Sequence, residues 1–353
     1  MSAASVAKVI FWVSFAAVSY AYIGYPLLLV LWRRLSARPV RPGTGEPTVS
    51  LIIAAWNERR NIAAKLENCL ELDYPADRLE IIVALDGCTD GTEHAVAPYV
   101  ERGVVVLESK ARAGKAVRLN EAVAASTGDV LVFADTRQVL DKRAIRELVA
   151  SLDDPSVGVV SGELVLDSAT SGNDIEVGTG PGLYWRYEKW IRSMESSINS
   201  MLGATGALYA IERRLFKPIP PGTILDDVAI PMHAVLQGKR AVFEPRAKAY
   251  DTACEEVREF ERKVRTLTGN FQLLALMPEL LHPQRNPVFL QYVSHKVSKL
   301  VVPYFLLAML VSNAFVRDGI YLAAFAGQCL VYAAASVGAV VSRRQLLLST
   351  GRS

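Results

Sequence analysis

Cysteine is scarce in this sequence of 353 residues. The four cysteines, Cys69, Cys88, Cys254 and Cys329, stand far apart and form no C-x-x-C pair. This spacing predicts neither a disulfide framework nor a zinc site. In a cytoplasmic domain we expect their thiols to be reduced.

An excess of charge of one sign is also lacking, because the formal net charge is only +3. The sequence has no basic stripe with interleaved aromatic residues, so we expect no nucleic-acid partner. It has no internal repeat and no low-complexity tract. The length suffices for one substantial core and a smaller second unit.

Long hydrophobic runs are what the sequence has in excess, since 51% of its residues are hydrophobic. The runs 9–32, 300–316 and 320–341 each approach the length of about 20 residues that crosses a bilayer. The first run lacks a strong basic n-region and an A-x-A-like cleavage site, which favours a retained anchor over a signal peptide. A buried helical pair is the alternative for the other two. Only "RDG" separates them, which favours a membrane hairpin.

Lysine and arginine near the runs predict the orientation. With three crossings, all these clusters share one face, so the N-terminus lies outside and the polar middle and C-terminus lie in the cytoplasm. The clusters are Arg33, Arg34, Arg38 and Arg41; Lys296 and Lys299; and Arg343 and Arg344. The predicted parts are an anchor at 1–34, a linker at 35–47, a cytoplasmic domain at 48–272, interfacial helices at 273–298, transmembrane helices at 299–342 and a cytoplasmic tail at 343–353.

Residues 49–135 alternate between strand and helix patterns. The apolar runs "VSLIIAAW", "LEIIVALDG", "GVVVLES" and "DVLVF" have strand length without polar alternation, and segments with helical spacing separate them. This pattern predicts an α/β fold with a mostly parallel sheet and helices on both faces. Ligands of such sheets bind beyond the carboxyl ends of the strands. A strand at 157–166, a Gly- and Ser-rich loop at 168–182 and an aromatic helix from residue 183 follow.

Two of these strands end in a carboxylate at the ligand edge. Asp86 stands in "LDGCTDGT" and Asp135 in "VFADTRQ". Asp86 suits a hydrogen bond to a nucleoside, and the alternative is a turn that only caps the next helix. Lys115 follows a glycine at a predicted helix start, where positive charge and free N–H groups suit a phosphate. A solvated lysine is the alternative there.

The ordered set "VSLIIAAWNERRNI", "LDYP", "LEIIVALDGCTDGT" and "GKAVRLNEAVAASTGDVLVFAD" resembles the nucleotide-sugar-binding half of family 2 glycosyltransferases. This is the inverting GT-A type, to which cellulose, chitin and hyaluronan synthases also belong. The resemblance covers about residues 47–272 and implies a GT-A, Rossmann-like domain at 48–272. It implies a UDP-sugar donor, with Asp86 on the uridine, Asp135 near ribose and metal as the leading Asp of D-x-D, and Glu58 and Lys115 also in the donor site.

The third position of this D-x-D is Arg137 instead of Asp. A cation there would oppose a metal on Asp135, unless its side chain turns away or bonds the diphosphate itself. Asp135, the diphosphate and water still suffice for Mg²⁺, which normally keeps several waters. The expected cofactor is therefore Mg²⁺ or Mn²⁺, with Asp135 as metal ligand and Arg137 among the donor-binding residues.

The segment "ILDDVAIP" resembles the family's E-D segment, which makes Asp227 the implied catalytic base and Asp226 its partner. Inversion needs a base that takes the proton of the acceptor hydroxyl. Two adjacent carboxylates repel one another, which makes one of them more basic. The alternative is capping of the following helix, which Asp226 can perform while Asp227 faces the acceptor.

The segment "ERKVRTLTGNFQ" occupies the place of the family's Q-x-x-R-W. Arg262 and Arg265 lie three apart on one predicted helical face and suit the departing diphosphate. A basic helix lying against anionic lipid headgroups is the alternative. Thr266 replaces the tryptophan of the family, which argues against processive synthesis through a self-made channel.

Acceptor contacts are predicted from two further segments that resemble bacterial membrane-bound members. Trp185 and Trp190 suit stacking on a sugar or lipid, with core packing as the alternative. Gly203 and Gly206 would lie below the sugar, where small residues allow close approach.

The resemblance and the apolar runs together imply an inverting transferase in a bacterial-type inner membrane. It would move a sugar from a UDP-sugar to a membrane-proximal glycan or lipid-linked acceptor, for exopolysaccharide or envelope glycan synthesis. Expected partners are the bilayer and polysaccharide-export or synthase proteins. Two alternatives remain: a transferase onto polyprenyl phosphate, and a non-catalytic nucleotide-sugar-binding subunit of a synthase complex, which Arg137 and Thr266 motivate.

Overall fold

The computed structural model describes residues 2–167, 183–252, 256–316 and 318–350. They fall into two compact units. One unit combines residues 1–28, 255–262 and 293–353, and the other combines residues 29–254 and 263–292. The Gly- and Ser-rich loop predicted at 168–182 lies outside the described residues.

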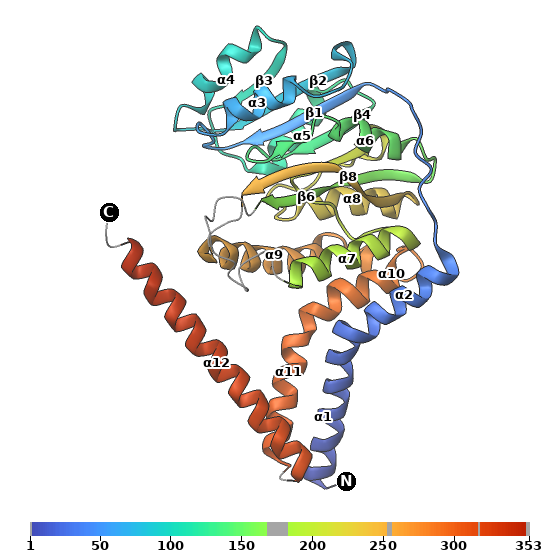
Figure 1. Cartoon of the computed structure of the whole chain (residues 1–353), viewed down its shortest axis with the longest axis vertical. Helices are drawn as coiled ribbons and strands as arrows, with labels where there is room; N and C mark the ends of the chain where they lie inside the picture. Colours follow the sequence, from blue (N-terminus) through green and yellow to red (C-terminus); the bar gives the residue numbers. More distant parts are fainter. Residues whose placement is uncertain (1, 168–182, 253–255, 317, 351–353) are drawn as a thin grey trace. The chain divides into compact units, whose positions relative to one another are not determined.

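Within the described residues, eight strands form one sheet in the order β3-β2-β1-β4-β7-β6-β8-β5 (Figure 1). The first four positions pair in parallel, whereas β7 runs antiparallel to both β4 and β6. The mostly parallel sheet predicted from the sequence is confirmed. The strands are β1 (Val49–Ala55), β2 (Leu79–Asp86), β3 (Val104–Ser109), β4 (Val130–Ala134), β5 (Val139–Leu140), β6 (Val157–Asp167), β7 (Leu208–Glu212) and β8 (Arg240–Thr252).

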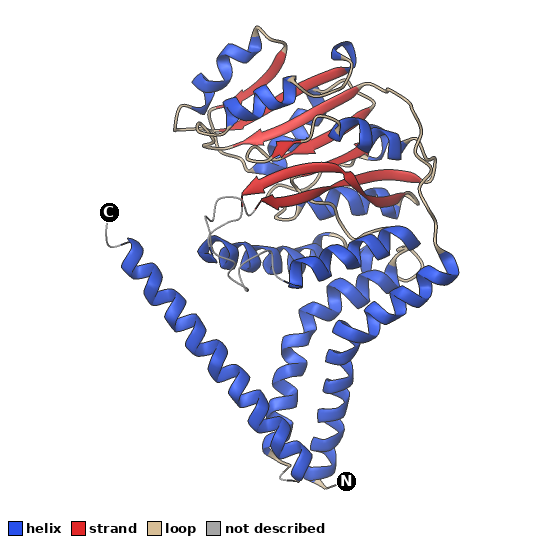
Figure 2. Cartoon of the chain, viewed as in Figure 1, coloured by secondary structure: helices blue, strands red, loops and turns tan. Residues whose placement is uncertain are grey.

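Helices lie on both sides of this sheet (Figure 2). The strands are apolar on both faces because helices cover both of them. The helices of this unit are α3 (Ile62–Leu70), α4 (Thr92–Val100), α5 (Lys115–Ala125), α6 (Ala144–Leu152), α7 (Leu183–Ile198), α8 (Asp226–Leu236), most of α9 (Glu256–Leu276) and α10 (Phe289–Tyr292), with the 3₁₀ turns η2 (Ala76–Arg78), η3 (Arg213–Leu215) and η4 (Pro278–Leu281).

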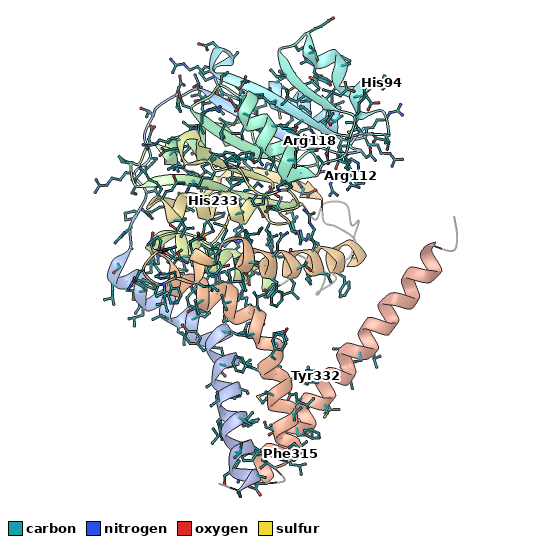
Figure 3. The ribbon with its side chains drawn as sticks, turned by 180° about the vertical axis from the view of Figure 1, so that it is seen from behind. His94, Arg112, Arg118, His233, Phe315 and Tyr332 are labelled. Atoms are coloured by element: carbon teal, nitrogen blue, oxygen red, sulfur yellow. The ribbon has the colours of Figure 1, made fainter. Side chains whose placement is uncertain are left out.

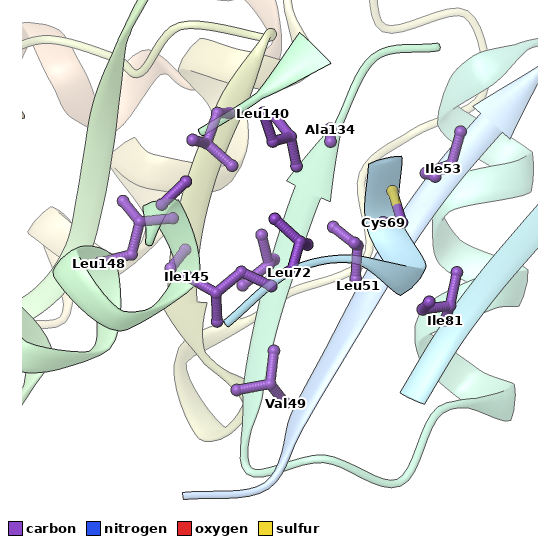
Figure 4. Packing of buried hydrophobic residues seen from close by; sticks show 14 of the residues in the cluster. Val49, Leu51, Ile53, Cys69, Leu72, Ile81, Ala134, Leu140, Ile145 and Leu148 are labelled. Carbon is purple, nitrogen blue, oxygen red and sulfur yellow. The ribbon is translucent and has the colours of Figure 1, made fainter. Parts of the chain in front are cut away.

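One core cluster fills the space between the sheet and helices α3, α4 and α6 (Figure 4). Leu51 and Ile53 of β1 point into it because alternate residues of a strand face the same side. Both are fully buried, as are Leu66 of α3 and Ile145 of α6. This packing holds the carboxyl ends of β1, β2 and β4 at one edge, where the site residues follow.

The other unit is built of apolar helices. Three helical segments of the described chain, Ala3–Ser36, Phe289–Ala314 and Gly319–Gly338, are long and apolar enough to cross a membrane. They comprise α1 (Ala3–Ser19), the π-helical turn η1 (Tyr20–Gly24) and α2 (Tyr25–Ser36); α10, the π-helical turn η5 (Val293–Val297) and α11 (Ser298–Ala314); and α12 (Gly319–Thr350). Helix α12 thus continues through residues 343–350, part of the predicted tail.

Side chains tie α1 to the start of α12 within this unit. Lys8 Nζ lies 2.5 Å from Asp318 Oδ2, and Trp12 Nε1 donates to the Tyr321 hydroxyl at 3.0 Å. Phe11 meets the Tyr321 ring edge-on at 5.2 Å. These contacts hold α1 against the start of α12, and Figure 3 marks Phe315, which directly follows α11.

Truncation in the main core should destabilise the sheet unit. We expect Ile53→Ala to lower the free energy of unfolding by about 2–5 kcal/mol, because it removes a fully buried side chain and leaves a cavity. The midpoint of denaturant unfolding of the full chain in detergent measures this. Val105→Ala is the control, since Val105 of β3 is 38% exposed; an equal loss in both variants would contradict the assignment of the core.

Candidate active site

Three chain segments that are distant in sequence meet at the carboxyl end of β4. Asp135 follows β4, Lys115 begins α5 and Asp226 begins α8. Lys115 Nζ lies 2.9 Å from Asp135 Oδ1 and 3.1 Å from Asp226 Oδ2. The ammonium of Lys115 therefore bridges two carboxylates that the sequence placed 91 residues apart, from Asp135 to Asp226.

Asp227 lies near Asp135, and Gly206 lies beside both of them. A Cβ atom on Gly206 would lie 3.4 Å from Asp135 Oδ2 and 3.5 Å from Asp227 Oδ2. The backbone N–H of Ala204 donates to the carbonyl of Asp227 at 2.7 Å, which fixes the start of α8 against this loop. The structure thus brings Asp135 and Asp227 next to Gly206, and Lys115 links Asp135 to Asp226.

The acidic pair differs in exposure and in partners. Asp226 is 4% exposed and paired with Lys115, whereas Asp227 is half-buried. The residue that precedes the helix as its N-cap is Leu225, and no side chain caps the helix there. The expectation that Asp226 caps α8 is therefore wrong, because its carboxylate is drawn to Lys115 instead.

The electrostatics of Lys115 follow from these neighbours. Burial favours the neutral amine, but the charges of Asp226, Asp135 and Asp227 outweigh burial and raise the pKa of Lys115. The side chain is consequently an ammonium throughout the physiological pH range.

Tyr209 of β7 is a site residue that the sequence analysis missed. Its side chain is fully buried, and its ring stacks on Phe133 of β4 at 4.9 Å between centroids. Phe133 and Asp135 lie two residues apart and so share a face. The Tyr209 hydroxyl has no hydrogen-bond partner among the described residues. Burial, and then the charges of Asp226, Asp227 and Asp135, raise the pKa of Tyr209 well above its usual value.

Asp86 organises the loop before α5. Its carboxylate accepts hydrogen bonds from the backbone N–H groups of Ala113, at 2.7 Å, and Gly114, at 3.0 Å, and from Arg118 Nε at 3.0 Å. Burial raises the pKa of Asp86, but these donors outweigh it, so the pKa is lowered. Asp86 therefore has a structural task next to Lys115, and its predicted contact with a nucleoside stays a prediction.

Arg137 and Glu58 interact with each other. Arg137 Nε lies 3.9 Å from Glu58 Oε1, and Asn61 Nδ2 donates to Glu58 Oε2 at 2.7 Å. Arg137 thus lies beside Glu58 near the start of α3, whereas Asp135 is paired with Lys115. The expected contact of Arg137 with the diphosphate stays a prediction.

An aromatic platform at the same sheet edge was also missed. The guanidinium of Arg112 lies 3.6 Å from the centroid of the Trp56 ring, and Trp56 is 44% exposed. Trp56 follows β1, and Arg112 lies in the loop held by Asp86; Figure 3 shows Arg112 near Arg118. The signal available in the sequence was a tryptophan directly after a buried strand.

The two predicted arginines of α9 are placed differently. Arg265 Nη2 lies 3.5 Å from the carbonyl of Ile224, two residues before the acidic pair. Gln272 of the same helix accepts from the Ile224 N–H at 2.9 Å, so this part of α9 supports the entry to α8. Arg262 belongs to the other compact unit, and its predicted contact with the diphosphate stays a prediction.

A pocket next to Gly206 contains one of the two predicted tryptophans. Trp185, Lys189 and Arg192 of α7 line it together with Thr205. Trp190 is 39% exposed and does not line this pocket. Gly203 is outside it as well: its φ of +127° and a Cβ position 2.8 Å from Val228 Cγ2 show that it allows close packing on α8.

Comparison with known proteins identifies the chain. The model of the family described as Glycosyl transferase family 2 matches residues 50–216, which contain nearly all of β1 to β7 together with Lys115 and Asp135 of the site. Residues 50–216 of the chain form a glycosyl transferase family 2 domain. Members of this family are nucleotide-sugar glycosyltransferases.

Other family 2 proteins resemble parts of the chain. It is 37% identical to the probable glycosyltransferase YdaM of Bacillus subtilis over 33% of this chain and 29% of that protein. It is 24% identical to the poly-beta-1,6-N-acetyl-D-glucosamine synthase of Staphylococcus aureus over 64% of this chain and 55% of that protein. The matched parts are therefore less than two thirds of either relative.

A solved structure extends the likeness to nearly the whole fold. The mannosyltransferase PcManGT of Pyrobaculum calidifontis, determined with GDP-Man and Mn²⁺, superposes with a TM-score of 0.72. The match covers 94% of this chain and 92% of that one at 22% identity. The GT-A fold with its apolar helices is thus shared.

The residues of this family 2 site do not fit the divalent cation that the sequence analysis expected at Asp135. Oδ1 of Asp135 is hydrogen-bonded to Lys115, and the third position of D-x-D presents the cationic Arg137, which offers no ligand. In the part of the chain that the structure describes, no three His, Cys, Asp or Glu side chains gather where they could hold a metal.

Asp86 should make stability depend on pH. Its folded pKa is lowered, so its contribution is complete above the unfolded pKa of about 3.9 and is lost as the pH falls through the folded value. We expect Asp86→Asn to cost about 3 kcal/mol at pH 7, because Arg118 loses a buried partner.

Thermal unfolding from pH 7 to pH 3 checks this, and the two proteins should converge in acid. Glu108→Gln on the neighbouring strand β3 is the control, because Glu108 is exposed. A gap between wild type and Asp86→Asn that stays constant down to pH 3 would contradict the ionic role.

Proposed function

We propose that the chain is an inverting glycosyltransferase that moves a sugar from a nucleotide-sugar to a hydroxyl of a membrane-proximal acceptor. The observation that carries this proposal is the convergence of Asp135, Asp226 and Asp227 with Lys115 around Gly206. It supplies a base and a cation for a diphosphate at one edge of the sheet.

The donor belongs at the carboxyl ends of β1, β2 and β4. The exposed Trp56, with Arg112 stacked on it, offers a flat surface for the base, and Asp86 lies one loop away. We assign UDP as the nucleotide, as expected from the sequence. Lys115 and Arg265 are placed to balance the charge of the diphosphate.

The chemistry needs one proton transfer and one displacement. Asp227 takes the proton of the acceptor hydroxyl. At the same time the oxygen of that hydroxyl forms a bond to the anomeric carbon, from the face opposite the diphosphate. The bond between that carbon and the phosphate oxygen breaks, and the electron pair leaves with UDP. Asp226 contacts Lys115 at 3.1 Å and is buried, and we assign the base role to the more exposed Asp227.

We assign the acceptor side to the face of α7 that carries Trp185 and Arg192, beside Thr205; the hollow that they line in this structure has room for about one water molecule. An indole beside charged groups suits a sugar ring with its hydroxyls. Helix α7 also contacts the chain where it leaves the first apolar segment, because Arg33 Nη1 donates to Met194 Sδ at 3.4 Å. This contact supports a glycan or lipid-linked acceptor close to the membrane.

The setting follows from the apolar helices. Three segments of the described chain have the length and composition of membrane spans. With the lysine and arginine clusters on the inside, the sheet unit faces the cytoplasm. An inner-membrane enzyme of exopolysaccharide or envelope glycan synthesis, working with export or synthase partners, fits this placement. Mg²⁺ or Mn²⁺, expected from the D-x-D, would have to displace Lys115 from Asp135 to bind there.

Replacement of the proposed base, Asp227, should lower the rate of sugar transfer without weakening the binding of UDP. We expect Asp227→Asn to lower kcat by about 10²- to 10⁴-fold while the affinity for UDP changes little. Full-length protein in detergent, a panel of UDP-sugars and native membranes as acceptor source measure UDP release, and calorimetry measures UDP binding. Asp77→Asn, at an exposed position in η2, should match the wild type.

Two outcomes would replace the proposal. Nearly full activity of Asp227→Asn would favour an acceptor that is already an anion, such as polyprenyl phosphate, because it needs no strong base. UDP binding without release from any UDP-sugar in the wild type would favour a non-catalytic subunit.

The two tryptophans predicted for the acceptor should behave differently. We expect Trp185→Ala to raise the KM for the acceptor about ten-fold with an unchanged affinity for UDP, since Trp185 lines the pocket. Trp190→Ala is the matched variant outside the pocket and should leave this KM unchanged. The opposite ranking of the two variants would move the acceptor site to another face of α7.

A further inference from the structure

The position that a divalent cation would take beside Asp135 is held by a side chain of the protein itself. Lys115 Nζ contacts carboxylates of Asp135 and Asp226 at 2.9 and 3.1 Å, and both residues are fixed at element ends. Lys115 is the first residue of α5, and Gly114 before it has a φ of +92°, which sets the direction in which the helix starts. The ammonium is therefore built into the fold.

Arg137 removes the second ligand that a metal would use. It stands where D-x-D has its second Asp, and its guanidinium lies beside Glu58. A further carboxylate at this position would add to the repulsion among Asp135, Asp226 and Asp227. An arginine instead adds positive charge at the rim of the site.

Cationic side chains stand beside the carboxylates of the site. Lys115 contacts Asp135 and Asp226, and Arg137 lies beside Glu58. Lys115 thus brings a positive charge to the place assigned to the diphosphate of a nucleotide-sugar. An ammonium has three N–H donors, and the contacts to Asp135 and Asp226 use two of them, which leaves one for a phosphate oxygen.

We propose that Lys115 is the resident cation of this site and that the protein binds and uses its donor without a divalent metal. The proposal rests on the donor assignment made above, and it concerns the cation alone. It assigns to Lys115 the neutralisation of the departing diphosphate, as an ammonium that is already in place before the donor arrives.

Nucleotide binding with and without metal tests this directly. Calorimetry on the full chain in detergent measures the affinity for UDP and for GDP, once with EDTA and once with excess MnCl₂. For the wild type we expect the affinity for the bound nucleotide to differ by less than about three-fold between the two conditions. A rise of about ten-fold or more with Mn²⁺ would overturn the proposal.

Lys115→Met provides the second arm. It should weaken nucleotide binding in EDTA by about ten-fold or more, because a hydrogen bond to a charged group is lost. With Asp135 freed, Mn²⁺ should restore part of the affinity. Electron paramagnetic resonance of free Mn²⁺ in the presence of UDP should show uptake by Lys115→Met and none by the wild type, and uptake by the wild type alone would overturn the proposal.

Two further variants keep the result interpretable. Lys115→Arg retains the positive charge and should bind the nucleotide in EDTA. If Lys115→Met fails to bind while Lys115→Arg binds, the loss of charge is the cause and not a loss of the fold. Lys142→Met removes an exposed lysine in the loop before α6 and should match the wild type in both conditions. Nucleotide binding by Lys115→Met in EDTA as tight as that of the wild type would overturn the proposal.

The donor assignment fails in a different pattern. If the wild type bound neither UDP nor GDP in EDTA or in MnCl₂, the proposed function would fall. If it bound one of them only with Mn²⁺, the proposed function would stand and the resident-cation role of Lys115 would fall.

Discussion

The structure of the site depends on one bridging ammonium. Asp135 at the end of β4 and Asp226 at the start of α8 both contact Lys115 Nζ, and two carboxylates that share one partner repel each other in a partly buried place. Lys115 offsets this repulsion because it contacts Asp135 and Asp226 at once. Burial of these charges is tolerable only while they are paired, so the ends of β4, α5 and α8 are held to one another.

Asp86 determines where that ammonium lies. It accepts the N–H groups of Ala113 and Gly114, the two residues directly before Lys115, and Arg118 of the same helix. Gly87 lets this loop approach, since a Cβ there would lie 2.7 Å from the Arg112 nitrogen. The same loop presents Arg112 to Trp56. One buried carboxylate at the end of β2 thus positions both the cation and the aromatic platform.

The sequence was informative about features that depend on local pattern. Continuous apolar runs predict buried parallel strands, and polar residues at their ends predict which side chains meet at the sheet edge, as Asp135, Lys115 and the 226–227 pair do. Choice of partner is not local. The links of Arg137 to Glu58 and Asp226 to Lys115 depend on distances between segments far apart in the chain. The same holds for Tyr209, whose place beneath the carboxylates follows from the antiparallel pairing of β7 with β4.

The replacement in the D-x-D and the bridging lysine are parts of one electrostatic arrangement. If the site bound a metal, a second carboxylate at position 137 would help to coordinate the divalent cation. With an ammonium, which carries one charge and three donors, the same carboxylate would leave the site too negative for a diphosphate. Arg137 corrects that excess, and Glu58 holds it at the rim and away from Lys115. A single cationic side chain, Lys115, then stands at the centre, with the Arg137–Glu58 pair at the rim.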